Sequence, residues 1–246
     1  MFATESNAQT VRVATYNVAL ERKGPGLMLG EIVEDAPQIS ALVEVITAAL
    51  PDVLVLTGFD NDAGDLALAQ FAARFGGNFP YFRGLVGNEG RESGLDLDGD
   101  GKLGGWADAL GFGKFPGNAG MAILTRYPIL SVSNENEILW TGVEGAGMPR
   151  RSDGSYFLRS DVAVKIPVFS HGFFEVDIDL GDSVLTVFAS YLSPPVFDGP
   201  EDMNGLRNAA ELQMIAGLLK GRSEPFALLA DLNNDPQKGE GHRAPL

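Results

Sequence analysis

Three groups of polar side chains follow apolar runs that are typical of strands. They contain Asn17, the pair Asp60 and Asp62, and the pair Asp231 and Asn233. Residues two apart on a strand point to the same side, so Asp231 and Asn233 can act together. A carboxylate and a carboxamide at this spacing suit a metal-bound water and a phosphate oxygen. The other reading is that Asp and Asn end strands because they form turns.

One of these runs ends without a chemical group. The stretch PDVLVLTGFDND places four apolar residues at 53–56, then Thr57 and Gly58. Chemistry in α/β proteins usually lies where such a buried strand ends, yet Gly58 has no side chain. The nearest carboxylate that could bind a metal from this strand is Asp60.

A separate acidic motif lies in a glycine-rich stretch. Its three aspartates alternate with other residues, at Asp96, Asp98 and Asp100. This spacing, followed by Gly101, matches the first half of a calcium-binding loop. The acid expected at position 12 falls on Ala107, with Asp108 one residue later, so the stretch is not a standard EF-hand. Two readings remain: a site for Ca²⁺ or another hard cation that fixes the loop, or a solvated acidic turn.

The composition limits the classes of partner. The formal net charge is −15 with only 18 Lys and Arg residues, and no basic stripe is present. Nucleic acid is therefore not expected as a stable partner. An acidic enzyme can still act on phosphates if bound cations reverse the local field. The absence of cysteine excludes disulfides, thiol nucleophiles and zinc–thiolate sites, and no apolar run is long enough for a membrane span.

These motifs need elements to position them, and the pattern predicts both strands and helices. We expect strands over 11–19, 53–57, 119–127, 129–138, 156–168, 173–180, 183–191 and 226–230. We expect helices over 38–50, 63–75 and from Asp202 or Asn204 to about Lys220.

This order predicts an α/β fold with two packed sheets and outer helices, a four-layer α/β sandwich. Residues 1–246 contain no internal repeat or linker, which favours a single domain. The segment 84–118 shows little periodicity, and such a long irregular segment suggests a function.

Several stretches together resemble the endonuclease/exonuclease/phosphatase family, which has the deoxyribonuclease-I-like fold. They are ATYNV at 14–18, PDVLVLTGFDND at 51–62, GLDLDGDGKLGG at 94–105, ADALGFGKFPGNAGMAILTRYPI at 107–129, SPPVFDGPEDMNGLRN at 193–208 and ADLNNDP at 230–236. The resemblance runs from about Val11 to Pro236 and is closest to a bacterial, often exported branch. It implies an exported protein, periplasmic or extracellular, whose signal peptide is absent from this chain.

The resemblance also implies roles for residues of this chain. In active members the first-strand asparagine, here Asn17, helps to hold the phosphate and the metal. The D-L-N aspartate, here Asp231, positions or activates the attacking water, and Asn233 orients the phosphate. An active member would use Mg²⁺ or Mn²⁺.

The departures from the family pattern concern its metal ligand and its histidines. The resemblance implies a metal-binding glutamate at Gly58 and a histidine at Tyr191. A histidine motif is replaced by Val162-Ala163-Val164-Lys165, another by Ala209-Ala210, and the final S-D-H motif is absent. Asp60 could substitute as a ligand, and Tyr191 could donate a hydrogen bond to phosphate. The two histidines, His171 and His242, are predicted to be surface residues.

Two functions follow. The first is a non-catalytic binding or assembly module with a degraded metal-phosphoesterase site, which the combined losses favour. The second is an active divalent-metal-dependent phosphoesterase, a nuclease or phosphatase that uses Asn17, Asp231 and Asn233. The family's strands after D-L-N are also expected to be missing, so we expect a protein partner to cover the open C-terminal sheet edge.

Overall fold

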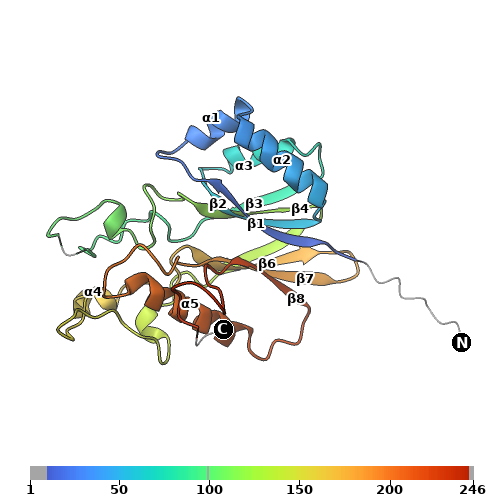
Figure 1. Cartoon of the computed structure of the whole chain (residues 1–246). Helices are drawn as coiled ribbons and strands as arrows, with labels where there is room; N and C mark the ends of the chain where they lie inside the picture. The colour runs from blue at the N-terminus through green and yellow to red at the C-terminus, as the bar shows by residue number, and fades with distance from the viewer. Residues whose placement is uncertain (1–9, 99, 244–246) are drawn as a thin grey trace, which may run out of the picture.

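The computed structural model describes residues 10–98 and 100–243. Two four-stranded sheets pack face to face, with helices on their outer faces (Figure 1). None of the helices in this described part is long and apolar enough to cross a membrane. The architecture is the four-layer α/β sandwich that the sequence predicts.

The first sheet has the order β1-β2-β4-β3. Its strands are β1 (Val13–Leu20), β2 (Val53–Phe59), β3 (Tyr81–Leu85) and β4 (Gly120–Thr125). β1 runs parallel to β2, and β4 is antiparallel to both β2 and β3. All seven residues of β2 are buried, because helices cover one face of this strand and the second sheet covers the other. Burial on both faces explains its continuous apolar run.

The second sheet has the order β5-β6-β7-β8. Its strands are β5 (Ile129–Asn134), β6 (Gly172–Asp179), β7 (Val184–Tyr191) and β8 (Phe226–Asp231). β5, β6 and β7 are antiparallel, whereas β8 runs parallel to β7 and ends at Asp231. The turn between β6 and β7 closes with a hydrogen bond from Leu180 N to Ser183 O, as the Gly181-Asp182 signal predicts.

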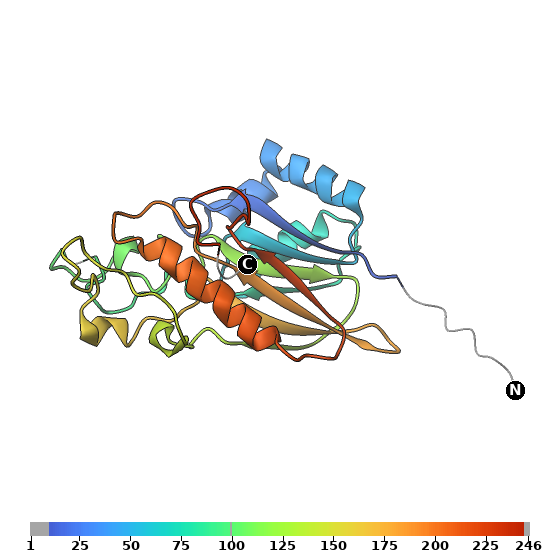
Figure 2. The ribbon, with the colours of Figure 1, turned by 60° about the horizontal axis from the view of Figure 1, so that its bottom comes forward.

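The helices form the two outer layers. Helices α1 (Leu27–Val33), α2 (Pro37–Ala49) and α3 (Leu66–Ala73) lie over the first sheet (Figure 1). The short α4 (Ser160–Ala163) and the long α5 (Met203–Leu219) lie on the side of the second sheet, and Figure 2 shows α5 crossing its strands. Single 3₁₀ turns form at Trp106–Asp108 and Trp140–Gly142.

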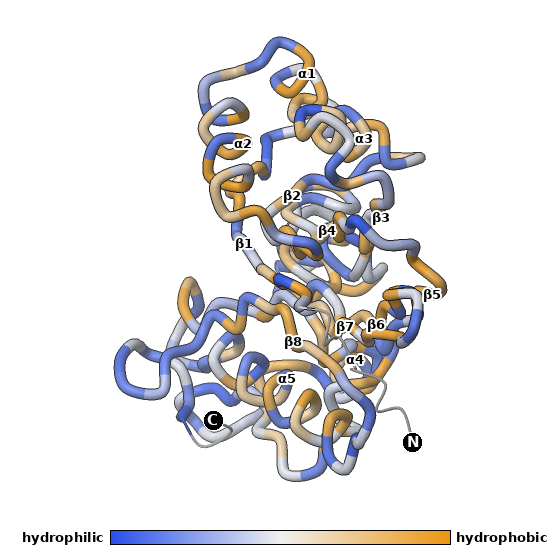
Figure 3. Tube along the Cα trace, turned by 90° about the vertical axis from the view of Figure 1, so that its right-hand side faces the viewer, coloured by the Kyte–Doolittle hydropathy of each residue, from blue (hydrophilic) through white to orange (hydrophobic). Residues whose placement is uncertain are grey.

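The core lies in three apolar layers, and both sheets stand between the helical layers in Figure 3. Between the sheets, Val55 and Ile123 meet Val176 and Val187. Alternate residues of the same strands, such as Leu54 and Leu56, point to the helices instead. The alternation of side chains along a strand thus divides the apolar residues between the two layers.

One predicted strand is wrong. Residues 156–168 form an irregular segment with α4 in place of a strand. Some of their backbone groups form hydrogen bonds outside a sheet, since the guanidinium of Arg207 donates to the carbonyls of Pro167 and Val168. Their apolar side chains pack with α5, so these β-formers are buried without joining a sheet. The helix α1 and the edge strand β3 were not expected from the sequence.

Candidate functional site

A cleft of about 630 Å³ opens between β1 of the first sheet and the end of β8 of the second. Its volume is in the range of small-molecule sites. It is lined by Thr15, Asn17, Pro194, Pro195, Val196, residues 230–235 and residues 238–241. Three of the four residues that the sequence placed in the catalytic group, Asn17, Asp231 and Asn233, line this one cleft.

Asn17 connects the two sheets at the floor of the cleft. Its Nδ2 donates a hydrogen bond to Asp231 Oδ2 at 2.9 Å and lies 3.5 Å from the Tyr191 hydroxyl. Its Oδ1 accepts a hydrogen bond from Ala19 N at 3.1 Å, which fixes the orientation of the amide. Burial, and then the charge of Asp231, raise the pKa of the Tyr191 phenol. The tyrosine hydroxyl is therefore protonated and neutral.

The D-L-N turn is held by hydrogen bonds from the backbone and the side chain of Asn233. Asn233 N donates to Asp231 Oδ1 at 3.2 Å, and Asn233 Nδ2 donates to Leu192 O at 2.8 Å. Asn233 adopts a left-handed conformation with φ of +49°, which asparagine tolerates well. Both carboxylate oxygens of Asp231 therefore already accept a hydrogen bond from an asparagine.

Gly58 lies at a bulge of β2, and its place is filled. The registers of β2 with β1 and β4 both shift around this residue, and its φ is +66°. A Cβ at this position would lie 2.7 Å from Asn17 Oδ1, closer than these atoms approach in proteins. The family resemblance implies a glutamate at this position. Here the backbone conformation favours glycine, and the Asn17 amide lies where a side chain would begin.

Asp60 is buried, with 4% of its surface exposed, and its oxygens are occupied. Oδ1 accepts hydrogen bonds from Asn118 Nδ2 and Ala119 N, both at 2.8 Å. Oδ2 accepts from Arg22 N at 2.8 Å. Asp60 joins the end of β2 to two loops, and it is not among the residues that line the cleft.

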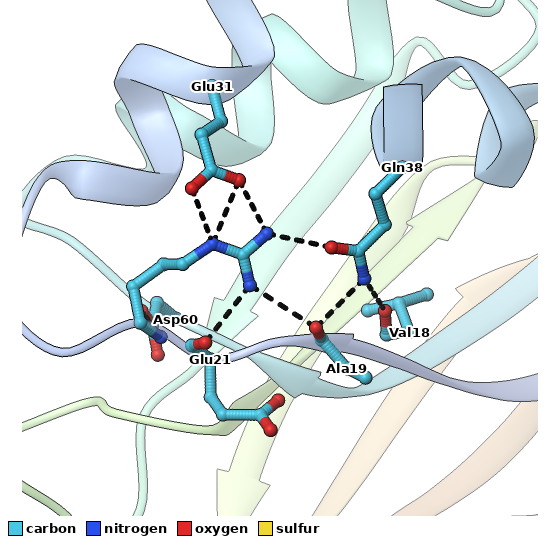
Figure 4. A network of polar contacts seen from close by, with 7 residues as sticks. Val18, Ala19, Glu21, Glu31, Gln38 and Asp60 are labelled. Carbon is cyan, nitrogen blue, oxygen red and sulfur yellow. Dashed lines mark hydrogen bonds and ion pairs between the residues drawn. The ribbon is translucent and has the colours of Figure 1, made fainter. Parts of the chain in front are cut away.

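The side chain of Arg22 extends this network to the outer helices (Figure 4). Its guanidinium donates to both carboxylate oxygens of Glu31, at 2.6 to 2.9 Å, and to Gln38 Oε1 at 2.9 Å. Gln38 Nε2 in turn donates to the carbonyls of Val18 and Ala19. The hydrogen bonds from Arg22 lower the pKa of the Glu31 carboxyl. The network fixes the chain that leaves β1, immediately after Asn17.

A buried polar face of α5 supports the other side of the cleft. Asn208 Nδ2 donates to Ser193 O and Leu232 O, while its Oδ1 accepts from Asn234 Nδ2. Glu211 accepts hydrogen bonds from Ser170 N, Ser170 Oγ and Ser193 N at 2.7 to 2.8 Å. One helix thus holds three loops, including the residue between Asp231 and Asn233.

The sequence matches a family model described as Endonuclease/Exonuclease/phosphatase family over residues 14–245. The chain belongs to this family. No sequence among the curated proteins matches it. Similar solved structures include the sphingomyelinase C of Streptomyces griseocarneus, with 19% identity and a TM-score of 0.52, over 94% of this chain and 67% of that one.

Two further structures are similar to this family member. An endonuclease/exonuclease/phosphatase from Beutenbergia cavernae has 17% identity and a TM-score of 0.51, over 95% of this chain and 51% of that one. A beta toxin mutant from Staphylococcus aureus with bound magnesium ions has 13% identity and a TM-score of 0.51, over 94% and 68%. The chain thus spans about half to two thirds of these proteins. At such identities the likeness shows the deoxyribonuclease-I-like fold alone.

A second candidate site of this family member lies in segment 84–118, among the described residues. Oxygens of Asp96, Asp98 and Asp108 lie within 4.8 Å of one another, close enough to share a cation. Asp108 is buried, and its Oδ1 also accepts a hydrogen bond from Leu97 N at 2.7 Å. Asp100, which the sequence pattern included, is not in this group; its Oδ1 accepts a hydrogen bond from Lys102 N instead. The 3₁₀ turn at Trp106–Asp108 carries Asp108, which sequence spacing had left one residue out of place.

The prediction for His171 is wrong, because this side chain is buried. Its Nδ1 lies 3.2 Å from Ser170 Oγ, and its ring centroid lies 4.2 Å from that of Tyr191. Burial lowers the pKa of His171 to about 3, so the imidazole is neutral. His242 is exposed, as predicted, and its Nε2 lies 2.6 Å from Asp202 Oδ2. No local pattern around His171 distinguished a buried strand start from a turn.

Proposed function

We propose that this protein is a non-catalytic member of its family that keeps the cleft as a binding or assembly module. The observation that supports the proposal is the state of Gly58. The missing ligand position is not an open vacancy, because Asn17 Oδ1 occupies the space that a side chain would enter. A lost carboxylate weakens cation binding, and a metal-dependent phosphoester hydrolase needs that cation.

The rest of the cleft supports the same proposal. Asp60 could replace the lost ligand only by giving up three hydrogen bonds to buried or partly buried groups. Each such loss costs roughly 1–3 kcal/mol. Among the described residues, no group of three carboxylate or histidine side chains gathers around Asp231. Tyr191 would supply a neutral hydroxyl where the family resemblance implies an imidazole.

The alternative is an active phosphoesterase, either a nuclease or a phosphatase. It is supported by the grouping of Asn17, Asp231 and Asn233 in one cleft. In that case Asn17 would help to hold the phosphate and Mg²⁺ or Mn²⁺, which would polarise a phosphate oxygen, and Asp231 would position the attacking water. Asp60 and Tyr191 would then act as the substitutes for the missing groups.

A hydrolysis assay tests the proposal. Phosphodiester and phosphomonoester substrates would be incubated with Mg²⁺, Mn²⁺ or Ca²⁺, and the wild type compared with the Asp231→Ala, Asn233→Ala double variant. We expect no turnover above the double variant. Metal-dependent turnover that the double substitution abolishes would establish the alternative.

The acidic cluster gives the proposed module a cation. We propose that Asp96, Asp98 and Asp108 bind Ca²⁺, because carboxylate oxygens in a flexible loop suit this ion. The bound ion would fix segment 84–118 and would have no part in catalysis. We further propose that the protein is exported and that a protein partner covers the outer edge of β8, the last strand of its sheet.

A further inference from the structure

A buried carboxyl group lies in segment 84–118, away from the cleft. Glu89 is 1% exposed, and the backbone around it is fixed on both sides. Asn88 N donates to His171 O at 2.7 Å, and Gly117 N donates to Glu89 O at 3.1 Å. Glu89 is therefore anchored in the fold, and its side chain has no route to solvent.

The carboxyl of Glu89 faces another acceptor. Glu89 Oε1 accepts a hydrogen bond from Gly87 N at 3.2 Å, whereas Oε2 is buried without a hydrogen-bond partner. Asn61 Nδ2 donates to Met121 O at 2.9 Å, which fixes the amide, and its buried Oδ1 also has no donor. A Cβ built on Gly120 would overlap both Asn61 Oδ1 and Glu89 Oε1. Both side chains therefore reach the space beside Gly120, and the Glu89 oxygen on that side is Oε1.

A buried carboxyl beside a buried amide oxygen that has no donor needs a proton or a cation, because a buried unpaired polar group is costly. Rotating the Asn61 amide does not help, since it would break the bond to Met121 O and turn an acceptor toward that carbonyl. Burial raises the pKa of Glu89 to about 8, and no charged side chain is among the causes. A proton on the carboxyl removes its buried charge and turns Oε1 into a donor toward Asn61 Oδ1.

The ionisable groups on the packed elements are committed elsewhere. The ring of His171 lies against Ser170 and Tyr191. Its backbone carbonyl accepts the hydrogen bond from Asn88 N. Asp60 accepts its three hydrogen bonds, and Arg91 pairs with Glu137 at 2.6 Å. Asp65 lies near Gly84, and Lys114 belongs to the 113–118 turn. None of them is a salt-bridge partner of Glu89 within the described residues.

We propose that Glu89 is a protonated carboxylic acid at neutral pH and shares its proton with Asn61. This acid–amide pair latches segment 84–118 onto the end of β2. The same segment carries Asp96, Asp98 and Asp108, so loss of the proton weakens one of the contacts that hold the loop of the acidic cluster. The proposal does not depend on whether the cleft is catalytic.

The first experiment compares the pH dependence of unfolding in the wild type and in Glu89→Gln, whose amide donates to Asn61 without a proton. The folded-state pKa of Glu89 lies above the unfolded value, from 4.5 to about 8. The stabilisation is therefore complete below about pH 4.5 and is lost as the pH rises to about 8. Relative to Glu89→Gln, the wild-type unfolding constant should rise tenfold per pH unit in this window. Glu92→Gln, an exposed acid of the same segment, should behave as the wild type.

A second measurement observes the proton itself. At pH 7 the infrared spectrum should contain a protonated carboxylic acid band that Glu92→Gln keeps and Glu89→Gln loses. Parallel pH profiles for the wild type and Glu89→Gln, or no such band, would overturn the proposal. A melting temperature that rises at pH 7 with Na⁺, K⁺, Mg²⁺ or Ca²⁺ in the wild type but not in Glu89→Gln would also overturn the proposal. The carboxylate would then be paired with a cation and not with a proton.

A measurement on the wild type covers the case in which Glu89→Gln does not fold. Amide hydrogen exchange, corrected for its intrinsic pH dependence, should accelerate in the described residues of segment 84–118 as the pH passes 8. Exchange in β6 and β7 should not change. Equal behaviour of the segment and these strands would also overturn the latch.

Discussion

Replacement of Gly58 by alanine tests whether the space beside this glycine is filled. Two costs are expected. The backbone at φ +66° lies in the left-handed region, which costs a residue with a Cβ roughly 1–2 kcal/mol. The new Cβ would also displace Asn17 Oδ1 and break its hydrogen bond with Ala19 N, at about 1 kcal/mol.

The sum is a loss of roughly 2–3 kcal/mol in the free energy of unfolding. For a chain of this size, 1 kcal/mol corresponds to about 2–4 °C, so the melting temperature should fall by roughly 4–12 °C. Thermal and denaturant unfolding measure this loss. The matched control is Gly221→Ala, because Gly221 has φ of +78° and no atom within 4 Å of the new Cβ. The control should show only the backbone cost.

Equal losses for the two variants would contradict the reasoning, since the contact with Asn17 would then have no effect. A second variant tests the functional consequence. Gly58→Glu restores the residue that the family resemblance implies, yet the carboxylate must displace Asn17 to enter the site. We expect it to unfold more easily and to remain inactive. Metal-dependent hydrolysis by Gly58→Glu would show that the position is open.

Three further predictions concern other parts of the molecule. Ca²⁺ at 100 times its dissociation constant should raise the free energy of unfolding of the wild type by about 2.7 kcal/mol. Calorimetry should show that Asp108→Asn abolishes this stabilisation, and an unchanged stabilisation would exclude Asp108 as a ligand. Asn208→Ala should cost roughly 2–4 kcal/mol in denaturant unfolding, because it removes three hydrogen bonds, one to a buried group and two to partly buried groups. A loss below about 1 kcal/mol would show that α5 does not hold these loops. The unfolded chain protonates His171 below pH 6.5 but the folded one only below about 3. Relative to His171→Phe, the wild type should therefore lose about 1.4 kcal/mol of stability per pH unit as the pH drops through this window, and parallel profiles for the two proteins would contradict the burial.

Much of the fold is readable from the sequence because burial leaves a periodic trace. The continuous apolar run of β2 marks a strand covered on both faces. Helix α1 was not predicted because it is only seven residues long and buries just Met28 and Ile32. Residues 156–168 were wrongly predicted as a strand because their apolar β-forming residues indicate burial. Packing against α5 produces the same sequence pattern as pairing in a sheet.

The site was less readable, because its decisive contacts join distant parts of the chain. The missing side chain of Gly58 is visible in the sequence, but the presence of Asn17 Oδ1 in its space depends on how β1 and β2 bulge. Asp108 was left out because a linear pattern cannot show a 3₁₀ turn bringing it back toward Asp96. Glu89 and Asn61 carry no motif, and only the fold places both side chains beside Gly120.

The two polar networks at β1 differ in how far apart their members lie in the chain. Arg22 reaches Glu31 and Gln38, which are 9 and 16 residues away, whereas Asn17 and Asp231 are separated by 214 residues. Closing a longer loop costs more chain entropy, so local contacts can form before distant ones. We expect the β1–α1–α2 unit to fold first and the cleft to assemble last. Pulsed hydrogen exchange would show late protection at the D-L-N turn, and simultaneous protection would refute this order.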